Sequence, residues 1–355
     1  MNKNLVIGVL VLFSLVLAVG GCLPVFHRFD YSAWVVGEVA DDGKAMLLFS
    51  GDSGETWIRQ GLDILPDGKS LNDVFAVNNR EVWVVGVDGL VMHTDDGGDF
   101  WSLVDISEVA DGASLNCISV IEDKVWLSGE NGVVVYSEDS GVNWNASTLP
   151  EDTEDYLIQG IFAVTPNIVY AVGNKSFAPF GLVLRTENGG ESWEKIELPN
   201  NYSNIPWIGV KAVDEDHLVL FGRVGHFVVT ANGGEQWVTG GPLFPKDINS
   251  LVMLDKSHYW AACDFDTIII TEDSGISWKE QESAGTSNSF LMGIDALDKH
   301  HALIVGRSAG YPLYGKILRT SNGGNTWEAV YENADDSETP LAKVSIAQNY
   351  PKKIN

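Results

Sequence analysis

A short motif that recurs along the chain combines residue types that could do chemistry. Each copy contains a hydroxyl, a carboxylate or amide, a glycine and a tryptophan. The pattern is Ser/Thr-x-Asp/Asn-x-Gly-x-x-Trp, and its seven copies end at Trp57, Trp101, Trp144, Trp193, Trp237, Trp278 and Trp327. A carboxylate at the third position has the chemistry of a general acid or a metal ligand. That position holds Asp52, Asp96, Asp139, Asp273, Asn188, Asn232 and Asn322. Because an amide cannot replace a charged acid or ligand, we interpret these residues as structural.

The physical chemistry of the pattern is that of a tight turn. Hydroxyl and carboxylate oxygens accept hydrogen bonds from nearby backbone N–H groups. Glycine at the fifth position permits a positive φ, and the tryptophan can then begin a strand and bury its ring between neighbouring units.

The spacing of the copies indicates the fold. Successive tryptophans are 41 to 49 residues apart, a period typical of propeller blades with four short strands each. In the second unit we expect strands at residues 71–77, 81–85, 90–94 and 101–104. The sequence therefore predicts an all-β, seven-bladed β-propeller of four-stranded blades over residues 31–355.

The two ends of this region predict how the ring closes. The first unit lacks an innermost strand, whereas the spare segment 341–347 aligns with the innermost strand of the fourth unit at 158–164. We expect the C-terminal strand to pair into the first blade, because closure removes exposed sheet edges.

The repeats resemble those of known families. The turn pattern resembles the Asp-box, or BNR, repeat of sialidases and related propellers. The longer unit 82–101, Val-Trp-Val-Val-Gly followed by Thr-Asp-Asp-Gly-Gly and Trp, is similar to the photosystem II assembly/stability factor family, with echoes at 33–37, 125–129 and 169–173. This resemblance implies a non-enzymatic scaffold that binds a protein and aids assembly or stability of a membrane complex. Photosynthetic members of that family share a basic arginine patch, whereas the seven arginines here are dispersed; we therefore expect an envelope complex as the client.

The N-terminal segment predicts export and membrane attachment. Lys3 precedes an apolar run of 15 residues, which is shorter than the ~20 residues of a membrane span and suits a signal peptide. The run ends in Val-Gly-Gly-Cys22, which resembles a bacterial lipobox. We expect residues 1–21 to be removed, Cys22 to be lipidated and residues 22–30 to form a tether. An uncleaved anchor is the alternative. The predicted location is the bacterial cell envelope, on the periplasmic face of the outer membrane if there are two membranes.

Composition limits the partners. The formal net charge is −27, which repels phosphate backbones, so we expect no nucleic-acid binding. The charge favours a basic partner segment. The three cysteines include no CxxC pair and the histidines form no cluster, so we predict no metal and no cofactor. We expect a monomer with Cys117 and Cys263 as buried free thiols.

Function should lie on the face opposite the Asp-box turns, built from the loops that connect the second to the third strand and one blade to the next. Acidic loops at 105–111, 151–155 and 332–338 would suit a basic segment. Exposed aromatic side chains commonly mark partner sites, unless they fold back over their own loops. The candidate partner-binding residues are Phe177, Phe180, Trp207, Arg223, Arg307, Tyr311 and Tyr314.

Two other functions stay open. The same aromatic side chains could stack on sugars in a glycan-binding module without catalysis. A glycoside hydrolase would need two carboxylates at a defined separation, and the candidates for such a pair are Asp88, Glu130, Asp264 and Asp266.

Overall fold

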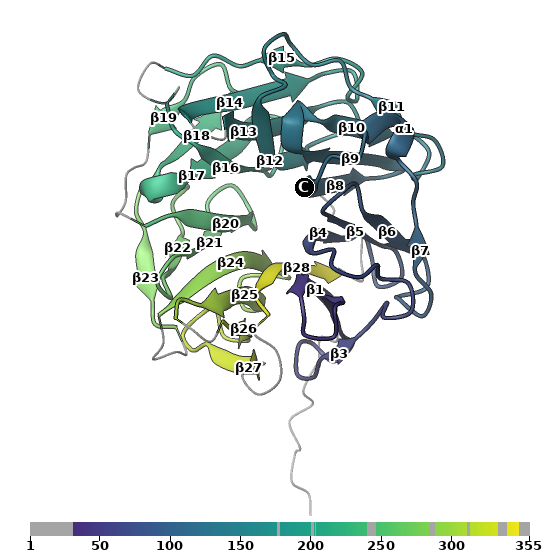
Figure 1. Ribbon diagram of the computed structural model, residues 1–355. Helices are drawn as coiled ribbons and strands as arrows, with labels where there is room; N and C mark the ends of the chain where they lie inside the picture. The colour runs from purple at the N-terminus through teal and green to yellow at the C-terminus, as the bar shows by residue number, and fades with distance from the viewer. Residues whose placement is uncertain are drawn as a thin grey trace, which may run out of the picture.

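The computed structural model describes residues 31–175, 178–199, 202, 204–239, 246–283, 288–310, 313–332 and 339–347. These residues form seven antiparallel sheets of four strands each, arranged around a central axis (Figure 1). The predicted seven-bladed propeller is confirmed. Within the described ranges, no helix has the length and apolar character needed to span a bilayer.

Each blade is given from its innermost to its outermost strand. Blade 1 contains β28 (Leu341–Ala347), β1 (Ser32–Val39), β2 (Ala45–Ser50) and β3 (Ile58–Arg59). Blade 2 contains β4 (Leu71–Ala76), β5 (Val82–Gly86), β6 (Val91–Thr94) and β7 (Ser102–Leu103). Blade 3 contains β8 (Leu115–Ile121), β9 (Lys124–Gly129), β10 (Val134–Ser137) and β11 (Asn145–Ala146). Blade 4 contains β12 (Tyr156–Ala163), β13 (Val169–Lys175), β14 (Ala178–Thr186) and β15 (Glu194–Lys195).

The remaining three blades follow the same order. Blade 5 contains β16 (Trp207–Ala212), β17 (His217–Gly222), β18 (Phe227–Ala231) and β19 (Val238–Thr239). Blade 6 contains β20 (Ile248–Met253), β21 (Tyr259–Cys263), β22 (Ile268–Thr271) and β23 (Lys279–Gln281). Blade 7 contains β24 (Ser289–Ala296), β25 (Ala302–Ser308), β26 (Gly315–Thr320) and β27 (Glu328–Glu332). Helix α1 (Ser107–Ala110) and two 3-10 turns, η1 (Glu130–Gly132) and η2 (Arg223–Gly225), lie in connections.

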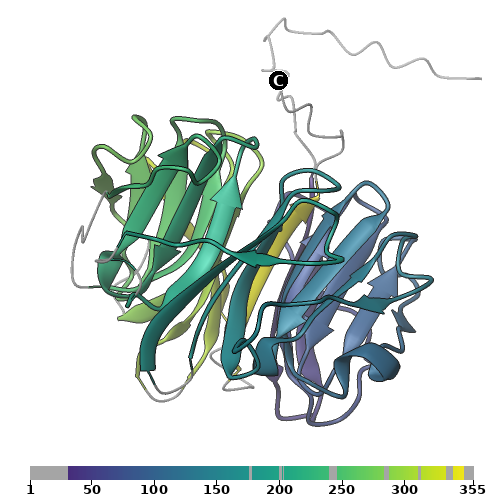
Figure 2. The ribbon, with the colours of Figure 1, turned by 90° about the horizontal axis from the view of Figure 1, so that it is seen from above.

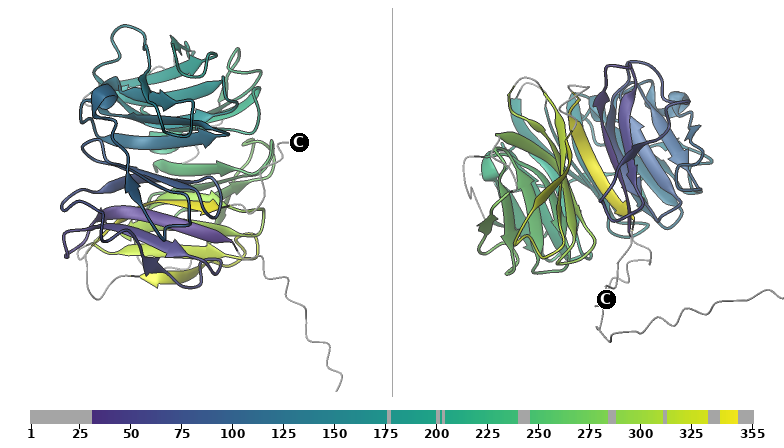
Figure 3. Two further views of the ribbon diagram at one scale, coloured as in Figure 1. Left: turned by 90° about the vertical axis from the view of Figure 1, so that its right-hand side faces the viewer. Right: turned by 90° about the horizontal axis from the view of Figure 1, so that it is seen from below.

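The C-terminal strand closes the ring, as predicted. Strand β28 pairs antiparallel with β1, from Ser32 opposite Ala347 to Gly37 opposite Leu341. The two ends of the propeller domain are therefore adjacent in one sheet, seen as the yellow strand beside the purple one in Figure 3. Blade 1 is the only four-stranded sheet of the described chain assembled from both ends of the sequence.

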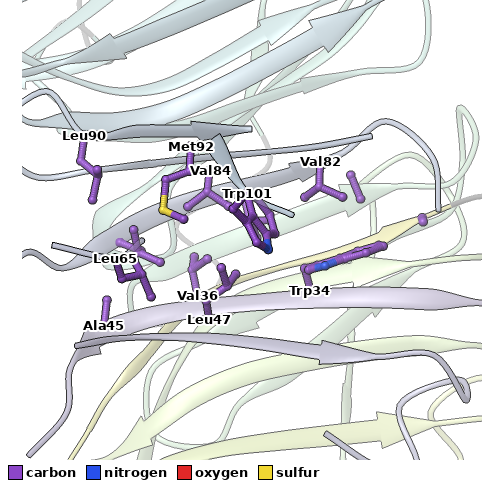
Figure 4. Packing of buried hydrophobic residues seen from close by; sticks show 14 residues of the cluster. Trp34, Val36, Ala45, Leu47, Leu65, Val82, Val84, Leu90, Met92 and Trp101 are labelled. Carbon is purple, nitrogen blue, oxygen red and sulfur yellow. The ribbon is translucent and has the colours of Figure 1, made fainter. Parts of the chain in front are cut away.

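The second strand of each blade is buried on both faces, because blades stand side by side with their sheet surfaces together (Figure 2). In β5, Val82 and Val84 pack against blade 1, among side chains that include Trp34 and Val36 (Figure 4). The alternate side chains of β5, Trp83 and Val85, pack against blade 3. Such a strand has a continuous apolar run in place of alternation, which explains the Val-Trp-Val-Val sequence.

The hydrophobic core is divided into seven clusters, one between each pair of adjacent blades. Each cluster includes one Asp-box tryptophan, which packs against the preceding blade. Trp101 of blade 2, for example, lies against Val36 and Leu47 of blade 1 (Figure 4). The tryptophans therefore join the blades to one another.

The seven Asp boxes form one common turn. In every copy the hydroxyl of the first residue donates to Oδ1 of the third, at 2.8–3.1 Å. That Oδ1 also accepts the N–H of the seventh residue at 2.8–3.1 Å. The glycine at the fifth position has φ between 76° and 105°. Asp and Asn boxes share these bonds, so the shared oxygen atom, and not a charge, builds the turn.

Strand register gives the propeller two distinct faces. Leu71 pairs with Gly86 at one end of blade 2, whereas Val82 pairs with Thr94 of the Asp box at the other. We call the first end the top face and the second the Asp-box face. The Tyr31 carbonyl accepts a hydrogen bond from the N–H of Ser53, in the first Asp box, at 3.1 Å. The chain therefore enters blade 1 at the Asp-box face.

Candidate functional site

Two-residue turns between the second and third strands line the top face in four blades. Both central residues of each turn have φ between 51° and 68°: Asp88 and Gly89, Asn131 and Gly132, Val224 and Gly225, Phe265 and Asp266. Asp, Asn and Gly adopt such turns readily. Both turn residues of blades 2 and 3 therefore suit the conformation. In blades 5 and 6 the first turn residue, Val224 or Phe265, does not.

Val224 and Phe265 occupy a strained conformation with their side chains facing solvent. A positive φ costs a residue with a bulky or β-branched side chain about 1–2 kcal/mol. Val224 is nonetheless 50% exposed and Phe265 47% exposed. Backbone strain combined with a half-exposed apolar side chain is unfavourable for folding, and such outliers gather at functional sites.

Phe265 belongs to a row of stacked side chains that crosses from blade 6 to blade 7. Its ring centroid lies 5.5 Å from that of Phe290, and the Arg307 guanidinium lies 5.0 Å from the centre of the Phe290 ring. We call Phe265, Phe290 and Arg307 the aromatic shelf. The Arg307 guanidinium forms no ion pair and no hydrogen bond with any residue in the described part of the chain, so its N–H donors are available for a carboxylate.

A buried ion pair fixes the turn beneath the aromatic shelf. Lys316 Nζ of blade 7 lies 2.5 Å from Asp266 Oδ1, and the lysine side chain is only 1% exposed. The Asp266 N–H donates to the Ser289 carbonyl at 2.9 Å. Lys246 also donates to the hydroxyl of Thr267. These contacts, from blade 7 and from the connection that leads into blade 6, fix the turn that contains Phe265.

The top face of blades 2 to 4 is acidic. Asp88 and Glu130 are exposed at their turns, and exposed carboxylates crowd the 105–111 and 151–155 segments. Two lysines partly offset them: Lys69 lies 3.8 Å from Asp88, and Lys175 lies 3.7 Å from Asp155. Residues 333–338 of the third acidic loop lie outside the described residues.

Of the seven candidate partner-binding residues, four lie at the top face, two lie outside the described residues, and Trp207 is buried. Phe180 (50% exposed), Arg223 and Arg307 lie at the top face, as does the half-buried Tyr314. Arg223 is already paired with Asp247, at 2.7 Å. Phe177 and Tyr311 lie outside the described residues.

Trp207 corrects the sequence-based expectation of a surface contact. Its side chain is wholly buried between blades 4 and 5. Trp207 pairs with Gly222 as Leu71 pairs with Gly86, so it occupies the first buried position of the innermost strand. It therefore takes no part in an exposed binding surface. The sequence also predicts a long loop between the second and third strands at 174–182, but most of this stretch belongs to β13 and β14.

The innermost strands contain a second group of charges, Asp73, Lys211, Asp295 and Lys343. Asp73 accepts the N–H of Ile118 at 3.0 Å, and Asp295 accepts that of Ile346 at 2.7 Å. Burial raises the pKa of Asp73, against the opposing effect of Lys343 and Lys211. Each carboxylate joins two innermost strands, so we interpret this group as structural.

The Asp-box face contains a network that the sequence interpretation missed. Three Asp-x-x-His turns, starting at Asp214, Asp255 and Asp298, follow the innermost strands of blades 5 to 7. Lys256 links its turn to Asp214, and Lys299 links its turn to Asp255, each at 2.8 Å. The Asp-x-x-His pattern, repeated in three consecutive units, is the signal that would have found it.

Burial would raise the pKa of Asp255, but hydrogen bonds from Lys299, His258 and Ser257 outweigh it and hold the pKa below its usual range. A carboxyl with a depressed folded pKa stabilises the protein above its unfolded pKa of about 3.9, and that stability is lost as the pH falls below it. We expect Asp255→Asn to lower stability at neutral pH and to flatten its decline in acid.

Urea denaturation at a series of pH values from neutral to acidic would measure this effect. Asp99→Asn, at an exposed carboxylate with no hydrogen bond to the described residues, is the control and should retain the acid slope of the wild type. An acid slope in Asp255→Asn as steep as that of the wild type would contradict the assignment.

Two of the four carboxylates named as candidates for hydrolysis are held by other side chains of the described chain. Asp266 is held in the ion pair with Lys316, and Asp264 accepts a hydrogen bond from Asn249 at 2.8 Å. Among the described residues, no three His, Cys, Asp or Glu side chains converge on a metal-sized site. Cys117 and Cys263 are free and buried, and burial raises the pKa of the Cys117 thiol to about 12.

Comparison with a family model identifies the repeats. The model described as "Photosynthesis system II assembly factor YCF48" matches residues 25–149 and 122–240. Together the matches span more than half of the 355-residue chain. The chain belongs to this family. The resemblance of its repeats to photosystem II assembly factors is thereby confirmed.

Solved structures of YCF48 have a similar fold. The chain is 20% identical to "YCF48 bound to D1 peptide", with a TM-score of 0.64 over 82% of this chain and 89% of that one. It is 21% identical to "YCF48 from Cyanidioschyzon merolae", with a TM-score of 0.58 over 73% and 84%.

A GH74 enzyme of Niastella koreensis is 9% identical, with a TM-score of 0.50 over 90% of this chain and 69% of that one. At these identities the likeness to solved structures shows the fold alone. The search of curated proteins gave no match.

Proposed function

We propose that the protein is a non-enzymatic scaffold that binds a protein partner on its top face and aids assembly or stability of a membrane complex in the cell envelope. Membership of the assembly-factor family is the observation that carries this proposal. A relative of similar fold is described as bound to a D1 peptide, which supports a peptide segment as the kind of partner.

The chemistry of the top face supports a partner of mixed character. Half-exposed apolar side chains in blades 4, 5 and 6 (Phe180, Val224 and Phe265) provide contact area that folding does not require. The exposed carboxylates of blades 2 to 4 would attract a basic segment and orient it during encounter. A partner segment with apolar residues over blades 4 to 6 and basic residues over blades 2 to 4 fits this surface.

Membrane attachment through Cys22 completes the proposal. Residues 1–30 lie outside the described residues, and the lipobox-like sequence supports the attachment. The described chain begins at the Asp-box face, so a tether of residues 22–30 would leave the top face free. Mass spectrometry of the protein extracted from membranes should find Cys22 as a lipidated N-terminal residue. An N-terminus upstream of Cys22 would instead favour the uncleaved anchor.

The function is tested by comparing membrane complexes of cells with and without the protein on native gels, with mass spectrometry of each band. We expect one membrane complex to decrease and its subassemblies to accumulate, and both changes to be reversed by the wild-type gene. An unchanged set of complexes would contradict an assembly role and direct attention to glycan binding or hydrolysis.

A further inference from the structure

The aromatic shelf has properties that separate it from the rest of the surface. Phe265 keeps a positive φ of 56° where the corresponding turns of blades 2 and 3 have Asp88 and Asn131. Its ring is half-exposed although an adjacent ring, Phe290, lies 5.5 Å away. The residue type is therefore unfavourable for the turn and incompletely used for packing.

The shelf is also held rigidly from below. The buried pair of Lys316 with Asp266 and the Asp266 N–H bond to Ser289 tie the turn to blade 7. An apolar side chain fixed in this way loses little conformational freedom when a partner covers it. Such preorganisation suits an anchor site.

Arg307 gives the shelf its chemical selectivity. The guanidinium stacks on Phe290 at 5.0 Å, which leaves its N–H edge open. The described ion pairs occupy Arg59, Arg185, Arg223 and Arg319 with carboxylates of the chain itself, and none occupies Arg307. Arg80 also lacks a carboxylate partner among the described residues, but it lies at the Asp-box face, where its Nε donates to the Asp95 carbonyl. Of the two described arginines on the top face, Arg223 is paired with Asp247 and Arg307 is not.

We infer that the aromatic shelf is the anchor site for a partner peptide that places a bulky apolar side chain on Phe265 and Phe290 and an adjacent carboxylate on Arg307. This inference rests on the proposed protein-binding function and adds the chemistry of the segment that is recognised. The carboxylate could belong to an Asp or Glu side chain or to a chain end.

The test selects peptides with the full-length protein. The probe is a library of random linear peptides of ~12 residues, long enough to cross two blades at about 3.3 Å per residue, with free or amidated C-termini. We expect selection of a bulky apolar residue next to Asp or Glu, or next to a free C-terminus, and comparison of the two sets separates these sources.

Variants then locate the bound peptides. Phe265→Asn should weaken binding by about tenfold or more, and its melting temperature should equal or exceed that of the wild type because Asn suits the turn. Arg307→Gln should weaken only the peptides with a carboxylate. Asn131→Gly, at the equivalent turn of blade 3, is the matched control and should leave binding unchanged.

Two outcomes would overturn the inference. In the first, the selected peptides keep their affinity for Phe265→Asn. In the second, Phe265→Asn melts well below the wild type, which would make Phe265 a packing residue. The proposed function would survive either outcome if partners in the native membrane still crosslink to the top face, and would fail on its own if they do not.

Discussion

A chain that ends at Pro340 should no longer fold into a stable ring. Without β28, blade 1 lacks its innermost strand and the buried side chains of Leu341, Val344 and Ile346. Burying side chains of this type contributes about 1.5–3 kcal/mol each, and their sum is comparable with the ~5–15 kcal/mol stability of a typical domain.

Hydrogen bonds across the closure add to this loss. The truncation removes the Ser345 hydroxyl that accepts the Ala76 N–H at 3.0 Å, and the Ile346 N–H that Asp295 accepts. It also exposes β1 as a free edge, which favours aggregation. Circular dichroism and thermal melting would show the effect. The matched control ends after Ala347 and should melt like the wild type; unchanged melting of the shorter chain would refute closure by β28.

Lys316→Met should have the largest effect of any single substitution near the aromatic shelf. It leaves Asp266 without its partner in a site where the carboxylate is only 13% exposed. Removing one member of a buried ion pair costs about 3–5 kcal/mol, because the other charge remains buried. We therefore expect a fall of that size in the free energy of unfolding, measured by urea denaturation.

Two further variants make this prediction specific. Lys316→Met combined with Asp266→Gly removes both charges and supplies a residue suited to the positive φ, so stability should return close to that of the wild type. Lys279→Met removes an exposed pair with Glu272, in which the lysine is 73% exposed, and should cost at most about 1 kcal/mol. Equal losses for Lys316→Met and Lys279→Met would contradict a buried pair.

Much of the fold could be predicted from the sequence because its determinants are local and repeated. The hydroxyl, the third-position oxygen and the glycine of each Asp box interact within a few residues, so every copy forms the same turn. The alignment of 341–347 with 158–164 predicted closure for the same reason.

Residues of the site were harder to predict because their environment depends on neighbouring blades. Trp207 looked exposed when considered alone, yet it occupies the buried position of Leu71 and Leu115 in other blades. Phe265 appeared as one apolar residue between two aspartates. Only the strand register of four blades shows that it stands where Asp88 and Asn131 make the same turn. Lys316 and Asp266 are 50 residues apart, and nothing local indicates their contact.

The strained turns of the top face lower the stability of the fold, and the proposed binding function accounts for that cost. Val224 and Phe265 have the side chains of a contact surface in turns that favour Asn and Gly. On the Asp-box face, the described non-glycine residues at positive φ are Ser53, Glu122, Ser140 and Ser274, none of them apolar, and the exposed Phe100, Val142 and Ile276 have no positive φ. Strain and an exposed apolar side chain therefore coincide at Val224 and Phe265 of the top face. This difference between the two faces is the reason for placing the partner on the top face.

Photo-crosslinking of the full-length protein in its own membranes tests that placement most directly. A photoreactive residue would replace Val224 or Asp88 on the top face, and Phe100 or Ile276 on the Asp-box face, with the captured proteins identified by mass spectrometry. We predict crosslinks to the subunits of one membrane complex from the top-face positions only. Crosslinks confined to the Asp-box positions, or no protein captured from Val224 and Asp88, would contradict a partner held on the top face.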